Sequence, residues 1–187
     1  MTVELIIGAI VVLVILFAVL TYNGLVGKRN QMRNAWGQID VQLNRRHDLI
    51  PNLVNAVQGY MNHERDVLDR VTTARAQAIA AGSNVAQRAD AENQLTQAVR
   101  SLFAVAEAYP QLRASENMLS LQEELSSTEN RIAFARQFYN DSVMQYNTAR
   151  ESFPAVIFAG AMGFHAGDLF TLDEAAPERA VPAVQFG

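Results

Sequence analysis

Residues 35–71 decide the fold, and they read AWGQIDVQLNRRHDLIPNLVNAVQGYMNHERDVLDRV. Their apolar and aromatic side chains recur at steps of three and four residues, which is the period of an α-helix packed against other helices. These side chains are Trp36, Ile39, Leu43, Ile50, Leu53, Val57, Tyr60, Val67 and Val71. The pattern predicts one long helix from about residue 28 to residue 80, against which the rest of the chain packs.

Two charges and a proline interrupt this apolar face. Arg46 and Glu64 occupy positions on it, and Pro51 lies within the same pattern. Proline lacks a backbone N–H and crowds the carbonyl four residues earlier, so we expect a kink near residues 47–50. Alternatively, Asp48 caps a new helix that begins just before Pro51.

Arg46 and Glu64 are separated by about 27 Å along a helix and therefore cannot pair with each other. Each requires a partner from another helix, because an unpaired buried charge is costly. The candidates are Glu124 or Glu129 for Arg46, and Arg131 or Arg136 for Glu64. Such pairs would fix how the helices dock. The alternatives are positions at the exposed edge of the bundle, or a functional charged site.

An uncharged stretch lies near the N-terminus. Residues 5–22, LIIGAIVVLVILFAVLTY, would span about 27 Å as a helix, close to the thickness of a bilayer core. A signal peptide has a basic start and a small-x-small cleavage site, and this stretch has neither. The sequence therefore favours a retained membrane anchor over residues 1–27, with a break at Tyr22-Asn23-Gly24 before the bundle.

The charges that flank this stretch predict its orientation. Glu4 precedes it, while Lys28, Arg29 and Arg33 follow it closely. Basic residues gather on the cytoplasmic side of membrane helices, so the N-terminus is predicted outside the cell and the bundle in the cytoplasm.

The remaining sequence predicts shorter helices joined by turns. Residues 81–84, AGSN, form a turn before a second helix over about 85–108, which Tyr109-Pro110 ends. A third helix is expected over about 111–152 and a short one over 155–164, which completes a bundle over residues 28–164. Residues 165–187 are expected to be an irregular tail, lying along the bundle or partly disordered.

No useful strand pattern is present, so the expected fold is all-α. It consists of an N-terminal transmembrane helix and an up-and-down antiparallel bundle of three long helices plus a short C-terminal helix. The first helix is longer than the second, which leaves part of it uncovered. Either an extra short helix or another copy of the chain would cover that length, and the latter predicts a homo-oligomer.

Composition and motifs exclude several functions. The chain has 187 residues and no cysteine, and the absence of cysteine excludes disulfides and thiol chemistry. Its net charge of −4 argues against nucleic acid as a partner. His63-Glu64 begins an HExxH zinc motif, but its fifth residue is Val67. Neither a Glu-x-x-His motif nor a nucleophile–base pair is visible. The sequence therefore predicts no enzyme activity, no metal and no cofactor.

A repeat of polar residues marks the third helix. Tyr139-Asn140 and Tyr146-Asn147 lie seven residues apart, so each residue type returns to the same helix face. A tyrosine ring can fill a core while its hydroxyl reaches a polar partner. The repeat predicts an interior hydrogen-bond network, with a polar ligand groove as the alternative.

Two runs resemble a known family. AWGQIDVQLNRRHDLIPNLVNAVQGYMNHE (35–64) and LQEELSSTENRIAFARQFYNDSVMQYNTARESFP (121–154) resemble the LemA family of bacterial membrane proteins. The likeness covers nearly the whole chain, anchor included, although His47 stands where tyrosine is expected in much of the family. It implies an anchored helical bundle in the bacterial inner membrane, but no reaction. LemA-like genes often occur with those of membrane zinc metalloproteases, so the resemblance also implies such a protease as a partner.

Four functional hypotheses follow. The first is a membrane-anchored, self-associating scaffold or interaction protein. The second is an accessory subunit of a membrane metalloprotease in envelope protein quality control. The third is an enzyme in its own right, which would need a deep polar pocket lined by acids with raised pKa values. The fourth is a membrane-shaping protein whose apolar residues 155–164 touch lipid.

Overall fold

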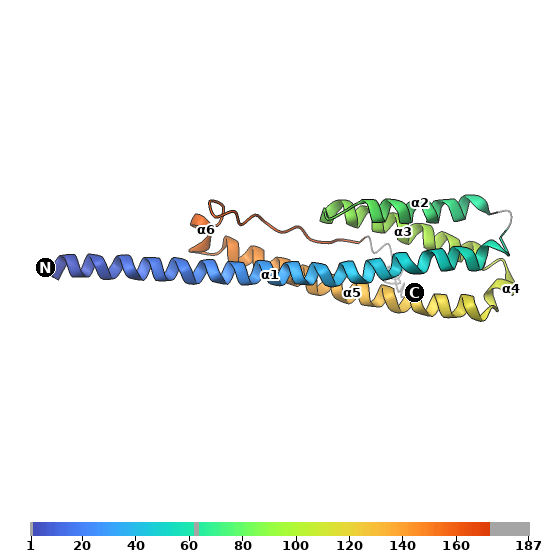
Figure 1. Cartoon of the computed structure of the whole chain (residues 1–187), viewed down its shortest axis with the longest axis horizontal. Helices are drawn as coiled ribbons and strands as arrows, with labels where there is room; N and C mark the ends of the chain where they lie inside the picture. Colours follow the sequence, from blue (N-terminus) through green and yellow to red (C-terminus); the bar gives the residue numbers. More distant parts are fainter. Residues whose placement is uncertain (1, 62–63, 173–187) are drawn as a thin grey trace, which may run out of the picture.

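The computed structural model describes residues 2–61 and 64–172 as an elongated all-helical molecule (Figure 1). The helices are α1 (Thr2–Gln58), α2 (Arg65–Ala80), α3 (Val85–Ala106), α4 (Pro110–Arg113), α5 (Glu116–Glu151) and α6 (Ala155–Phe158). The described residues contain no strand, and the predicted all-α fold is confirmed.

The long helix α1 is the axis of the molecule, and α5 lies antiparallel along it (Figure 1). The hairpin of α2 and α3 packs on the half of α1 that is farther from the N-terminus, which creates an up-and-down bundle there. On the nearer half, an extended segment, residues 164–172, takes the place of this hairpin beside α1 and α5.

The first twenty residues of α1 project beyond the bundle. This part is long and apolar enough to cross a membrane, and its apolar stretch is not buried against the rest of the described chain. The predicted break at Tyr22-Asn23-Gly24 is wrong, because α1 continues without interruption to Gln58. Gly24 costs about 1 kcal/mol inside a helix, and burial of Leu25 against Tyr146 and Ala155 offsets that cost.

The predicted single helix over residues 28–80 is wrong, because it is two antiparallel helices. The N–H groups of Tyr60 and Met61 both donate to the carbonyl of Val57 at 3.0 Å, which closes α1. The chain then folds back, and α2 buries Val67 and Val71 in the same cluster as Val57. The apolar period persists across the turn because both helices bury one face in a shared core.

Pro51 lies inside α1 and does not end it. Its missing N–H leaves the carbonyl of His47 without a helical donor. Arg75 of α2 supplies the donor instead, since its Nε lies 2.7 Å from that oxygen. The new helix that Asp48 was expected to cap is therefore not formed. The proline instead creates an acceptor that joins α2 to α1.

The other bounds differ from the prediction by smaller amounts. The second predicted helix, 85–108, is α3 and ends at Ala106. The third, 111–152, is split into α4 and α5 by a turn at residues 114–115. The fourth, 155–164, is helical only over Ala155–Phe158, and the turns after it bring Phe164 into the core. Of the predicted tail, residues 165–172 lie along the bundle, and 173–187 lie outside the described residues.

Candidate functional site

A buried carboxylate, Glu92 of α3, is the centre of a charged cluster between the helices. Its side chain has no exposed surface and forms a hydrogen-bonded ion pair with Arg46 of α1. The neighbouring His47 places Nε2 at 2.9 Å from the other carboxylate oxygen, Oε1. Arg88, one turn before Glu92 on α3, donates from Nε to Oε1 at 3.1 Å. Both carboxylate oxygens are therefore occupied by basic groups.

Arg46 connects three helices. Besides Glu92, its Nη1 donates to Glu129 of α5 at 2.8 Å and to Thr96 of α3 at 3.1 Å. Glu129 is one of the two partners that the sequence suggested, whereas Glu124 is exposed and does not reach Arg46. Sequence reasoning missed Glu92. The signal was present, because Glu92 lies three residues before Leu95 on the apolar face of α3.

The surroundings of Glu92 and Arg46 keep both groups charged. Burial would raise the pKa of Glu92, but the hydrogen bond from His47 and the charge of Arg46 hold that pKa below its ordinary value. Burial would lower the pKa of Arg46, and the carboxylates of Glu129 and Glu92 raise it above its ordinary value. A carboxyl with a lowered pKa is a poor general acid near neutral pH, so this arrangement favours docking over proton transfer.

A further arginine extends the cluster toward the turn between α2 and α3. Arg88 donates from Nη2 to Asp40 of α1 at 3.2 Å and from Nη1 to the carbonyl of Gly82 at 3.4 Å. Gly82 adopts a positive φ of 65°, which glycine tolerates best. The cluster thus connects α1, α3, α5 and the turn between α2 and α3.

Glu64 does not occupy the position that the sequence predicted. It lies in the turn before α2, half-buried, and its side chain makes no capping hydrogen bond. Arg131 lines a surface groove beside Val41 of α1, and Arg136 donates to the carbonyl of Leu172. Val41 lies about 25 Å along α1 from its end near Glu64, so the expected pair with Arg131 is wrong. Glu64 lies outside α1, which ends at Gln58, and therefore does not share a helix face with Arg46.

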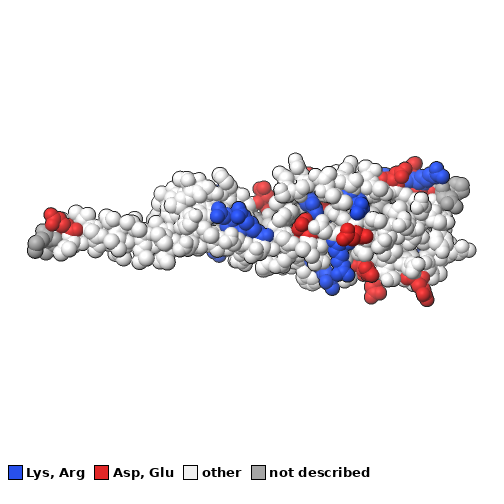
Figure 2. All heavy atoms as spheres, in the orientation of Figure 1, with Lys and Arg blue, Asp and Glu red and all other residues white. Residues whose placement is uncertain are grey.

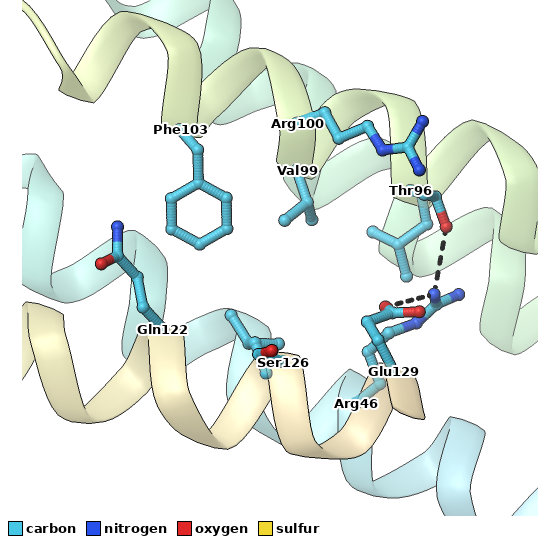
Figure 3. Close-up of a pocket in the computed structure, with 10 residues that line it drawn as sticks. Arg46, Thr96, Val99, Arg100, Phe103, Gln122, Ser126 and Glu129 are labelled. Carbon is cyan, nitrogen blue, oxygen red and sulfur yellow. Dashed lines mark hydrogen bonds and ion pairs between the residues drawn. The ribbon is translucent and has the colours of Figure 1, made fainter. Parts of the chain in front are cut away.

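A groove of about 380 Å³ opens between α3 and α5 next to Arg46 (Figure 3). Val99 and Phe103 of α3 line one side, Gln122 and Ser126 of α5 lie opposite, and the Arg46–Glu129 pair stands at one end. Among the described residues, Glu129 is the one acidic residue that lines this groove, and it is paired with Arg46, so the groove does not gather the several acids that the enzyme hypothesis needs.

The tyrosine–asparagine repeat of α5 holds residues 165–170 of the extended segment. The hydroxyls of Tyr146 and Tyr139 donate to the carbonyls of residues 165 and 168, each at 2.8 Å. Asn147 exchanges two hydrogen bonds with the backbone of Gly167, both 2.9 Å long. Asn140 does the same with Phe170, at 3.2 and 2.9 Å. The face on which the sequence placed a network is thus occupied by the chain's own C-terminal part.

Aromatic packing completes this contact. The ring of Trp36 lies 5.3 Å from that of Tyr139 and 5.4 Å from that of Phe170, between centroids. Burial and the nearby carboxylate of Asp168 raise the pKa of Tyr139 to about 12. Its hydroxyl therefore stays protonated and remains a hydrogen-bond donor at physiological pH.

Within residues 2–61 and 64–172, no group of three His, Asp or Glu side chains could hold a metal ion. The charged cluster and the tyrosine–asparagine repeat both join segments of this chain to one another. Together with the exposed apolar start of α1, they define a class of protein: an all-α bundle carried on a helix of membrane-spanning length.

The chain belongs to the LemA family, whose sequence pattern matches residues 35–186. It is also similar to Protein LemA of Metamycoplasma hominis, with 25% identity over 126 residues. That match covers 67% of this chain and 58% of the relative, so it spans little more than half of that protein. The LemA family is not a known enzyme family.

Proposed function

We propose that this protein is a membrane-anchored scaffold that associates with copies of itself. The observation that carries the proposal is that one helix, α1, both exposes a membrane-length apolar surface and forms the axis of the bundle. Lys28, Arg29 and Arg33 follow the apolar part, which favours a cytoplasmic bundle. From Leu25 to Gln58, α1 would carry the bundle about 50 Å away from the bilayer.

A candidate surface for self-association lies where α1 and α5 run side by side. Phe134 is 73% exposed and Phe138, one turn later on α5, is 43% exposed. Val41 of α1 is 62% exposed, and the three residues line one shallow groove with Gly37. We call Val41, Phe134 and Phe138 the α1–α5 apolar face. Two exposed phenylalanines one turn apart form a local apolar patch, and aromatic residues are enriched at interfaces.

Membrane anchoring favours a second copy as the occupant of this face. Two chains anchored in one membrane point in the same direction, so a two-fold axis along the membrane normal brings the same face of each chain together. Pairing the two faces would remove Phe134 and Phe138 of both copies from water. Burying each such side chain stabilises the contact by about 1.5–3 kcal/mol before the cost of association.

The mass of the full chain in detergent, measured by light scattering, tests this proposal. We expect a dimer or larger assembly for the wild type and a lower mass for the Phe134→Ser/Phe138→Ser variant. Leu119→Ser is the matched control, because Leu119 is an exposed apolar residue on the same helix outside the face. A monomeric wild type, or a double variant that keeps the wild-type mass, would contradict self-association through this face.

A further inference from the structure

The segment that follows α5 exposes large apolar side chains at the end of the bundle nearest the N-terminal part of α1. Phe153 is 79% exposed and Ile157 is 72% exposed. Val156 and Met162, in the same segment, are 54% and 45% exposed. We call these four residues the apolar foot. Such a concentration of apolar surface in ten residues is typical of a contact site for a membrane or a partner.

The opposite side of the same segment is packed firmly against α1. Ala155, Ala159 and Phe164 are buried in one cluster with Leu25. The ring of Phe164 meets that of Tyr22 edge-on, with 5.5 Å between centroids. Figure 1 shows α6 at the end of the bundle from which the N-terminal part of α1 projects. The apolar foot is therefore held at the level of Tyr22, where the uncharged stretch of residues 5–22 ends.

Basic residues lie just beyond this level. Lys28, Arg29 and Arg33 follow on α1, and the guanidinium of Arg29 lies 4.9 Å from the centroid of the Phe164 ring. Figure 2 shows Lys and Arg side chains gathered between the bundle and the uncharged bulge into which the slender apolar part of the molecule widens. Aromatic and apolar groups at the interface, with cations at headgroup depth beside them, match the layered chemistry of a bilayer surface.

We infer that the apolar foot inserts into the interface of the same membrane that holds α1, while the basic residues contact anionic headgroups. The inference rests on the proposed anchor and adds a second, separate contact with lipid. Leu25 lies only about 4.5 Å along the helix beyond Tyr22, so α6 and the end of the anchor reach the same depth. Two contacts side by side fix how the bundle is rotated about the axis of α1.

Fluorescence quenching by lipid tests the inference on the full chain. The chain contains no cysteine, so single cysteines can carry an environment-sensitive fluorophore at chosen positions. The labelled variants are Ile157→Cys in the foot, Leu13→Cys in the anchor and Leu119→Cys on α5, all exposed apolar positions. Each is reconstituted into vesicles of phosphatidylcholine and phosphatidylglycerol that contain a lipid spin-labelled near the headgroup.

We expect several-fold stronger quenching at position 157 than at position 119, and a blue-shifted emission at position 157. Position 13 is also measured in vesicles whose lipid carries a deeper spin label. Equal, weak quenching at positions 157 and 119, together with quenching at position 13 by that deeper label, would contradict insertion of the apolar foot and leave the proposed anchor intact. The absence of quenching at position 13 would overturn the anchor and the inference together. A Lys28→Gln/Arg33→Gln variant should show weaker quenching at position 157 in the anionic vesicles, and unchanged quenching would contradict the role of the basic residues.

Discussion

At the scale of single residues, buried polar groups determine how these helices dock. Pro51 frees a carbonyl that Arg75 occupies, and Glu92 gathers basic side chains from two helices. A proline inside a helix and a buried acid each destabilise a fold when they have no partner. Here each of them gives rise to a specific contact between helices. An unsatisfied buried group costs more than a satisfied one contributes, so these contacts mainly discourage other arrangements of the helices.

Arg75→Met should lower the free energy of unfolding by about 1–2 kcal/mol, because the carbonyl of His47 then loses its donor. In a Pro51→Ala background the backbone N–H of residue 51 can serve that carbonyl, so the same change should cost less. Denaturant unfolding of the wild type, the two single variants and the double variant, followed by circular dichroism, gives the coupling energy. Arg70→Gln, an exposed position on α2, is the control. Equal costs in both backgrounds would show that the Arg75 contact does not depend on Pro51.

Glu92→Gln should destabilise the bundle by about 3–5 kcal/mol, since it leaves Arg46 and Arg88 in the interior without their shared carboxylate. Glu124→Gln, on the exposed face of α5, should change stability by less than about 0.5 kcal/mol. Thermal unfolding of both variants and the wild type measures the difference. Similar melting temperatures for the two variants would contradict the central role of Glu92.

The pH dependence of stability provides a second measurement on Glu92. Its pKa is lower in the folded chain than its ordinary value of 4.5, so the unfolded chain binds the proton more tightly. The stabilisation is therefore present above pH 4.5 and is lost as pH falls from that value through the lower folded pKa. We expect the melting temperature of the wild type to fall over this acid range, and that of Glu92→Gln to fall less steeply. Parallel curves would contradict the lowered pKa.

At the scale of elements, the contact between α5 and the extended segment depends on asparagine side chains that pair with backbone as a neighbouring strand would. Asn140 and Asn147 lie seven residues apart, and the backbone groups they meet lie three residues apart, at Phe170 and Gly167. The helix and the extended segment run in opposite directions (Figure 1). Two helical turns rise about 10.5 Å, and three extended residues cover about 10 Å, so the two spacings agree.

Asn140→Ala/Asn147→Ala removes four hydrogen bonds to the extended segment and should release it from α5. Hydrogen–deuterium exchange should become faster at the backbone N–H groups of Gly167 and Phe170, while exchange in α2 and α3 stays close to wild type. Asn130→Ala, an exposed position on α5, should leave the exchange unchanged. Slow exchange that persists in the double variant would show that the aromatic packing around Trp36 is sufficient to hold the segment.

At the scale of the whole molecule, the sequence predicted the helical class, the faces that pack and the turn at residues 81–84, but not the turn between α1 and α2. Helical period alone cannot reveal that α2 folds back on α1, because both helices bury residues of one continuous apolar pattern. The pair of Arg46 with Glu129 could be proposed because each residue lies within a long, regular helical pattern. The partner of the tyrosine–asparagine repeat could not, because residues 164–172 are extended and show no period.

Because α1 is continuous, a change in the direction of its apolar start also moves the far end of the bundle. The helix is unbroken from its apolar start to the part that forms the bundle axis. A tilt imposed on the first twenty residues is thus transmitted along the remaining helix. Membrane helices adjust to bilayers of different thickness by tilting, commonly by about 20°. In the proposed membrane-anchored arrangement about 50 Å of helix lies beyond the bilayer, and such a tilt would displace the far end of the bundle sideways by about 17 Å. The thickness of the surrounding bilayer would then determine how far from the anchor the distal turns are presented.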